Sequence, residues 1–285
     1  MKYLLIVLLL VVANYLRAED MYNNYTFFSQ SKNNEVYAIS VLSGGGIFPV
    51  ELKAFTSIAN LEIKNCNILQ FTYDFSCFTK LESIIFDSCQ IQSYSDLFDK
   101  IVQIPHLNIL TIKNDSNFII PSNIQNLKTL KGLEIEHDNL MEIPEYLFYL
   151  DSLSYLSVDA NNIKIFNIND SINCLLDYLK INNNELTSLP KGIEKLKSLK
   201  FLYLNDNPNL QLEEICDILP HLENLELLAI CNTGKTEYIP LPKNISNLVK
   251  LKTVIITENH YSIEDLKILD ELRINYIFLK GPILH

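Results

Sequence analysis

A spacing of 23 residues constrains this chain more than any other feature of its sequence. The motif L-x-x-L-x-L-x-x-N-x-L, with other aliphatic residues in place of Leu and Asp in place of Asn, begins at Leu130, Leu153, Leu176 and Leu199, the last copy ending at its Asn. Apolar residues recurring at a constant interval of this length are the signature of stacked structural units. The spacing therefore predicts a repeat solenoid.

Weaker copies of the motif continue the register toward both ends of the chain. They begin near residues 36, 58, 81 and 107 on one side, and near 225, 251 and 274 on the other, with 22 to 26 residues between successive starts. We therefore expect about eleven coils, of which the imperfect first and last act as caps.

The template resembles that of the leucine-rich repeat family. The resemblance implies an α/β solenoid shaped as a curved horseshoe, with a parallel β-sheet on its concave face. Short 3₁₀, helical or extended segments would form the convex face. The resemblance also implies a binding module that uses its concave face. Many extracellular members carry cysteine-rich caps, whereas the six cysteines of this chain do not cluster at its ends.

Each residue type in the motif has a structural role. L-x-L alternation directs two apolar side chains inward and the residues between them outward. The ninth residue, usually Asn, is expected to turn the chain out of the strand. Its amide can bond main-chain groups that neighbouring coils would otherwise bury without partners. Cys66 and Cys89 occupy this ninth position on adjacent coils. Stacked cysteines allow a disulfide, but buried free thiols are the alternative that we favour.

The segments between the strands are short. Pro190 follows the strand motif so closely that it favours a 3₁₀ or extended segment. Residues 95–102 and 212–219 are amphipathic, and each has room for a turn or two of helix.

The N-terminus has the pattern of a signal peptide. Lys2 precedes an apolar run over residues 4–13, which is short for a membrane span. We expect cleavage after Ala18, a polar segment or cap over residues 19–35, and a repeat domain over residues 36–285. An uncleaved anchor helix is the alternative. No later apolar run is long enough to span, so the protein is expected to be secreted and not stably inserted in a membrane.

Secretion gives meaning to four N-glycosylation sequons, which begin at Asn24, Asn114, Asn169 and Asn244. The formal charge of −11 argues against nucleic acid as a partner, because the phosphate backbone requires a basic face.

The outward positions of the strands predict where a protein ligand binds. The third-position row reads Asn60, Ser83, Ile109, Gly132, Tyr155, Tyr178, Phe201, Leu227, Thr253 and Tyr276. Four neighbouring coils thus present Tyr155, Tyr178, Phe201 and Leu227, with Tyr203 beside them at a fifth position. Such aromatic patches are typical of contact sites. Glu134, Glu136 and Asp159 lie next to them and favour a partly basic partner. The alternative is that the aromatic rings only stabilise the sheet by packing together.

Two patterns that suggest chemistry are rejected. Residues 229–236 match a relaxed phosphate-binding loop, but the residues that follow do not open a helix. His137 with Glu134 and Glu136 is better explained as a solvated strand face than as a metal site. We therefore expect no catalytic residue, no metal and no cofactor.

Two classes of function remain. The favoured class is a secreted, non-enzymatic module that binds a protein, or less readily a glycan, on its concave face. The alternative is a structural or coat component that self-associates through its terminal coils, because Ile277, Phe278 and Leu279 end the chain as an apolar strand without a cysteine-stapled cap.

Overall fold

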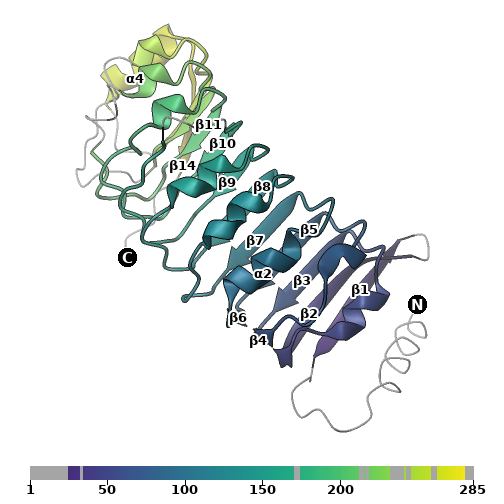
Figure 1. Cartoon of the computed structure of the whole chain (residues 1–285). Helices are drawn as coiled ribbons and strands as arrows, with labels where there is room; N and C mark the ends of the chain where they lie inside the picture. The colour runs from purple at the N-terminus through teal and green to yellow at the C-terminus, as the bar shows by residue number, and fades with distance from the viewer. Residues whose placement is uncertain are drawn as a thin grey trace, which may run out of the picture. The chain divides into compact units, whose positions relative to one another are not determined.

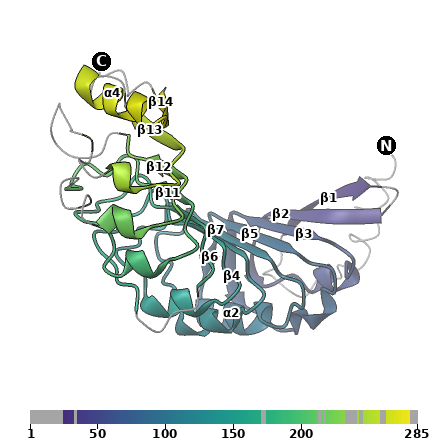
Figure 2. The same ribbon diagram turned by 90° about the horizontal axis from the view of Figure 1, so that it is seen from above.

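The computed structural model describes residues 25–32, 35–169, 174–211, 218–231, 245–257 and 262–279, together with Ile215 and Leu241. The chain forms two compact units that divide between His106 and Leu107, one of the expected coil starts. Within each unit, strands lie on one side and short helices on the other (Figure 1 and Figure 2).

The first unit begins with a hairpin and continues with parallel strands. β1 (Thr26–Lys32) pairs antiparallel with β2 (Glu35–Ile47), which pairs in parallel with β3 (Asn60–Lys64), and β3 pairs with β5 (Ser83–Asp87). The second half of β2 pairs with β4 (Cys66–Gln70), and β4 pairs with β6 (Gln90–Ile91). The opposite side consists of η1 (Val50–Ala54), η2 (Phe75–Cys77) and α2 (Tyr94–Ile101).

The second unit is a run of parallel strands, each paired with the next in sequence. The strands are β7 (Ile109–Lys113), β8 (Gly132–Glu136), β9 (Tyr155–Ser157), β10 (Tyr178–Lys180), β11 (Phe201–Tyr203), β12 (Leu227–Ala229), β13 (Thr253–Thr257) and β14 (Asn275–Leu279). Their return segments include η3 (Ser122–Asn126), η4 (Glu145–Tyr149), η5 (Ile193–Lys195), η6 (Leu219–His221), η7 (Ile245–Asn247) and α4 (Ile263–Glu271).

The core consists of the aliphatic positions of the motif. In the coil that begins at Leu176, the side chains of Leu176, Leu179, Ile181 and Leu186 are all fully buried. Burial of one such side chain stabilises the fold by about 1.5–3 kcal/mol. Neighbouring strands align the same motif positions, so Leu179 pairs with Leu156 and Leu202.

The ninth-position asparagines form the expected ladder between coils. Asn161 donates from Nδ2 to the carbonyl of Ile135 at 2.9 Å, and its Oδ1 accepts from the main-chain N–H groups of Asp138 and Leu140 at 3.0 and 3.1 Å. Asn184 and Asn207 repeat this arrangement in the next two coils. One amide per coil therefore satisfies buried main-chain groups of the preceding coil and of its own coil.

The residue before the ladder has an unusual backbone. The eighth residue of seven successive coils has a positive φ between 51° and 60°; these residues are Asn65, Ser88, Asn114, His137, Ala160, Asn183 and Asp206. A left-handed residue turns the chain out of its strand. The turn therefore depends on the eighth residue as well as on the ninth, to which the sequence analysis assigned it.

The return segments are short, as expected. Pro121 and Pro144 immediately precede η3 and η4, where a proline needs no N–H partner. The amphipathic segment expected at residues 95–102 forms α2, whose Ser93 cap accepts from the Asp96 N–H. Most of residues 212–219 lie outside the described residues.

Cys66 and Cys89 are buried thiols that form no disulfide, so the disulfide alternative is not realised. Cys89 donates from Sγ to the carbonyl of Ile63 at 3.3 Å, and Cys66 to that of Lys64 at 3.1 Å. A hydrogen bond with Cys89, together with burial, raises the pKa of the Cys66 thiol. The thiols thus occupy the ladder position as weak donors.

The hairpin at the start of the first unit was not predicted. β1 lies in the segment expected to be a polar cap, and it covers one edge of β2. Gly44 has a φ of 145°, and a Cβ at this position would lie 2.3 Å from Cδ1 of Tyr25. Glycine is therefore required where the Tyr25 ring packs against β2.

The last coil differs from its prediction by one residue. Asn275 pairs with Thr253, so Ile277 pairs with the outward residue Ile255 and is 48% exposed. The motif start at Ile274 put Ile277 at the inward fourth position and Tyr276 at the outward third position. Both assignments were wrong, because Tyr276 pairs with the buried Val254. The helix α4 was also missed, although its capping box, Ser262 with Asp265, is visible in the sequence. The helix returns the chain to the sheet after 22 residues instead of 23.

Candidate binding surface

The expected aromatic row exists on the strand face of the second unit. Tyr155, Tyr178, Phe201 and Leu227 are paired residues of four successive strands, β9 to β12. Tyr203 lies beside them at a fifth position, and all five side chains are half-buried. The strands thus hold a continuous apolar surface, which we call the aromatic row.

The rings of the aromatic row pack on one another. The ring centroid of Tyr178 lies 4.8 Å from that of Tyr155, 5.8 Å from that of Phe201 and 5.0 Å from that of Tyr203. Such cross-strand pairs stabilise a sheet. The packing alternative from the sequence analysis therefore describes a real contact, but it leaves part of each ring open to solvent.

A sixth residue extends the aromatic row. Ile109 is 45% exposed on β7, two strands from Tyr155. A Cβ at Gly132, on the strand between them, would lie 3.6 Å from Ile109 and 3.8 Å from Tyr155. The two side chains therefore flank the glycine. Ile109 was in the third-position row of the sequence analysis, and the strand register aligns it with Gly132 and Tyr155.

Asp159 does not face solvent, and its expected place in an exposed acidic cluster was wrong. The residue is 8% exposed; its Oδ1 accepts from the main-chain N–H of Asn182 at 2.8 Å, and its Oδ2 lies 2.5 Å from Nζ of Lys180. The side chain of Asn182 in turn accepts from the main-chain N–H of Asn205, and the side chain of Asn205 accepts from the main-chain N–H of Cys231. The seventh position thus forms a second ladder between coils.

Glu134 and Glu136 remain beside the aromatic row and are half-buried. Glu134 accepts from the Thr111 hydroxyl at 3.0 Å, and Glu136 from that of Ser157 at 2.9 Å. Glu134, Glu136 and Asp159 contribute three carboxylates to this region, and Lys180 contributes one ammonium group. Two formal negative charges therefore remain. Burial, together with the charge of Glu134, raises the pKa of Tyr155 to about 12.

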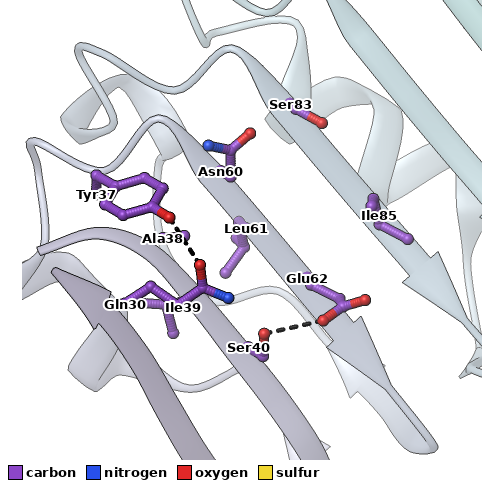
Figure 3. A pocket seen from close by; sticks show the side chains of 10 residues that line it. All are labelled: Gln30, Tyr37, Ala38, Ile39, Ser40, Asn60, Leu61, Glu62, Ser83 and Ile85. Carbon is purple, nitrogen blue, oxygen red and sulfur yellow. Dashed lines mark hydrogen bonds between the residues drawn. The ribbon is translucent and has the colours of Figure 1, made fainter. Parts of the chain in front are cut away.

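The first unit carries a separate small pocket on its own strand face (Figure 3). Its volume is about 220 Å³, and polar and apolar side chains both line it. Tyr37 donates to Gln30 at 2.8 Å and Ser40 to Glu62 at 2.9 Å, so most of its polar groups are already paired. Sequence reasoning did not find this pocket, because Gln30 comes from the unpredicted hairpin.

No protein-family model matches the sequence. A stretch of 108 residues is 28% identical to the NLR family CARD domain-containing protein 4 of Mus musculus, covering 34% of this chain and 10% of that protein.

Two solved structures are similar over most of the chain. A leucine-rich repeat protein of Leptospira interrogans matches with a TM-score of 0.59 and 23% identity, over 81% of this chain and 57% of its own. A chain of the Toll–Spatzle complex of Drosophila matches with a TM-score of 0.55 and 16% identity, over 78% of this chain and 30% of its own. This chain therefore spans only part of the length of each relative.

The chain has the leucine-rich repeat fold. The parallel strands, the short return segments and the ladder of asparagines agree with the repeat pattern of the sequence.

Two of the four sequon asparagines lie among the described residues. Asn114 is exposed at an eighth position, and Asn169 donates to Glu145 at 3.3 Å. The sequon asparagines Asn24 and Asn244, the signal segment and residues 232–236 of the loop-like motif lie outside the described residues.

The three residues of the rejected metal-binding pattern, Glu134, Glu136 and His137, lie at the end of β8. His137 is the left-handed residue after Glu136. Within the described part of the leucine-rich repeat chain, no three His, Cys, Asp or Glu side chains are grouped as metal ligands. No described helix is long and apolar enough to cross a membrane.

Proposed function

We propose that this chain is a secreted, non-enzymatic leucine-rich repeat module that binds a protein partner on its strand face. The aromatic row carries the proposal. Tyr is enriched among the residues that dominate binding energy in interfaces, and a contiguous apolar patch is typical of a contact site. The Toll–Spatzle complex supports the proposal by analogy of fold, because that protein assembles with another protein.

The partner is expected to combine an apolar centre with a basic rim. From β9 to β12 the aromatic row crosses three strand intervals, or roughly 14 Å at about 4.8 Å each. The two uncompensated charges beside Glu134 and Glu136 favour Lys or Arg on that side of the partner. Lys180 neutralises Asp159, so the attraction is centred on the two glutamates.

The test replaces Tyr178 and Phe201 together with Ser. The partner is first captured with mature wild-type protein, and its affinity is then measured for wild type and variant. We expect a loss of at least about 100-fold, since each central aromatic contributes about 2 kcal/mol or more. The matched control is Met141→Ser, which removes an apolar side chain that is 75% exposed and lies outside the strands. Binding by the double variant within twofold of wild type would refute the proposal, provided that both fold.

Secretion rests on the N-terminal sequence pattern. Expression of the full chain in a eukaryotic cell should release a protein whose first residue is Glu19, and digestion with an amidase specific for N-linked glycans should lower its mass. Retention of residues 1–18 in the membrane fraction would instead support the anchor alternative.

Self-association is a second candidate, favoured by the last strand. Among the described residues β14 pairs only with β13, and Ile277 is 48% exposed on it. An open strand edge can pair with another chain. Light scattering over a concentration series should then show oligomers that Ile277→Lys dissolves, whereas a monomer at every concentration excludes this function.

A further inference from the structure

The carboxyl group of Asp138 occupies a site that an amide fills in the following coils. Asp138 is the ninth residue of its coil and is 1% exposed. Its Oδ1 accepts from the main-chain N–H of Asp115 at 2.6 Å, as Oδ1 of Asn161 accepts from the N–H of Asp138 at 3.0 Å. The two side chains are therefore oriented alike, one coil apart.

This orientation places Oδ2 of Asp138 where Asn161 has its NH₂ group. Nδ2 of Asn161 donates to three carbonyls, those of Ile135, Val158 and Asp159, at 2.9 to 3.1 Å. The 23-residue register gives Ile112, Ile135 and Glu136 as the equivalent carbonyls around Asp138. Oδ2 of Asp138 is buried and has no donor to accept from. An ionised oxygen that is buried without a hydrogen-bond partner is strongly unfavourable.

We infer that Asp138 carries a proton in the folded protein and donates it from Oδ2 to the surrounding main-chain carbonyls, in place of the asparagine amide of the ladder. A protonated carboxyl has one acceptor oxygen and one O–H donor, which matches the two ends of a carboxamide. Ionisation releases this proton to water and removes the donor.

The charged neighbours favour the neutral form. Asp115 from the preceding coil is also buried, and Glu136 lies two residues earlier on the same coil. The following coil presents the neutral Asn161 at the matching position, and its Asp159 is paired with Lys180. Burial raises the pKa of Asp138 to about 8. Main-chain hydrogen bonds of Asp115 and Glu136 oppose this shift, and the charges of the same two residues add to it.

The coil that contains Asp138 is therefore most stable at acidic pH. The pKa of Asp138 is higher in the folded chain than its unfolded value of about 3.9. The stabilising contribution is therefore fully present below about pH 4 and is lost as the pH rises to about 8, with no further loss above that.

The decisive measurement is the titration of the Asp138 carboxyl carbon by ¹³C NMR in the full chain. The resonance is assigned by its absence in Asp138→Asn. A midpoint above about pH 6 supports the inference, and a midpoint below about pH 6 overturns it.

Unfolding in urea tests the same inference independently. The unfolding equilibrium of wild type relative to Asp138→Asn should shift toward the unfolded state by roughly tenfold for each pH unit between about 4 and 8. Asp270→Asn, the same change at an exposed residue of α4, should show no such trend. If the ratio of the unfolding equilibrium constants of wild type and Asp138→Asn does not change with pH, Asp138 carries no proton in the folded protein and the inference is wrong.

Discussion

Lys180 Nζ lies 2.5 Å from Oδ2 of Asp159, and this ion pair joins β10 to the end of the preceding coil. Because Asp159 also accepts from the Asn182 N–H, its carboxylate belongs to the ladder as well as to the strand face. Asp159 thereby neutralises the charge of Lys180 within the molecule. Burial lowers the pKa of Lys180, but the hydrogen bond and charge of Asp159 and the charges of Glu136 and Glu134 outweigh this effect and raise the pKa.

Asp159→Ala should lower the free energy of unfolding by about 2–3 kcal/mol, because it leaves a buried N–H without an acceptor. Urea unfolding measures the loss. The control is Asp151→Ala, which removes an exposed ion pair with Lys128 and should cost less than about 0.5 kcal/mol. Equal losses for the two variants would argue against a structural role of the seventh position.

Asn207→Ala should destabilise the second unit by about 2–4 kcal/mol. The change removes donors to the carbonyls of Ile181 and Leu204 and the acceptor of the Leu186 N–H, all of which are buried. Asn247→Ala, at the exposed end of η7, should change stability by less than about 0.5 kcal/mol. Thermal unfolding followed by circular dichroism distinguishes the two; similar transitions would show that the ladder is dispensable.

Gly44→Ala should loosen the N-terminal hairpin. The added methyl collides with the Tyr25 ring, and the φ of 145° is unfavourable for alanine, so a cost of about 1–3 kcal/mol is expected. Limited proteolysis should cut the variant between β1 and β2 faster than wild type. Gly132→Ala is the control, because a Cβ there meets its neighbours at ordinary contact distances. Unchanged protection in Gly44→Ala would mean that Tyr25 does not pack as described.

The Tyr155 hydroxyl should ionise late. Its pKa of about 12 exceeds the ordinary value of 10, so its contribution to stability is fully present below about pH 10 and is lost as the pH rises through 12. The difference in tyrosinate absorbance between wild type and Tyr155→Phe isolates this titration. A midpoint at the ordinary value would place the hydroxyl in open water, away from Glu134.

The repeat period by itself determined much of this protein. It located the strands, identified Leu179 and Ile181 as core, and assigned the buried ladder to the ninth residue, because side-chain direction alternates along a strand and apolar groups must be buried. The row Tyr155, Tyr178 and Phe201 followed from the same periodicity.

Only the tertiary structure decided what each outward or polar residue meets. Asp159 and Asp138 find their partners 23 residues away. Ile109 and Tyr155 flank Gly132, and α4 shifts the last strand by one residue. Polar contacts depend on the side chains that the adjacent coil supplies and on distances of a few tenths of an ångström. A sequence period fixes direction along one strand, but it contains neither of these quantities.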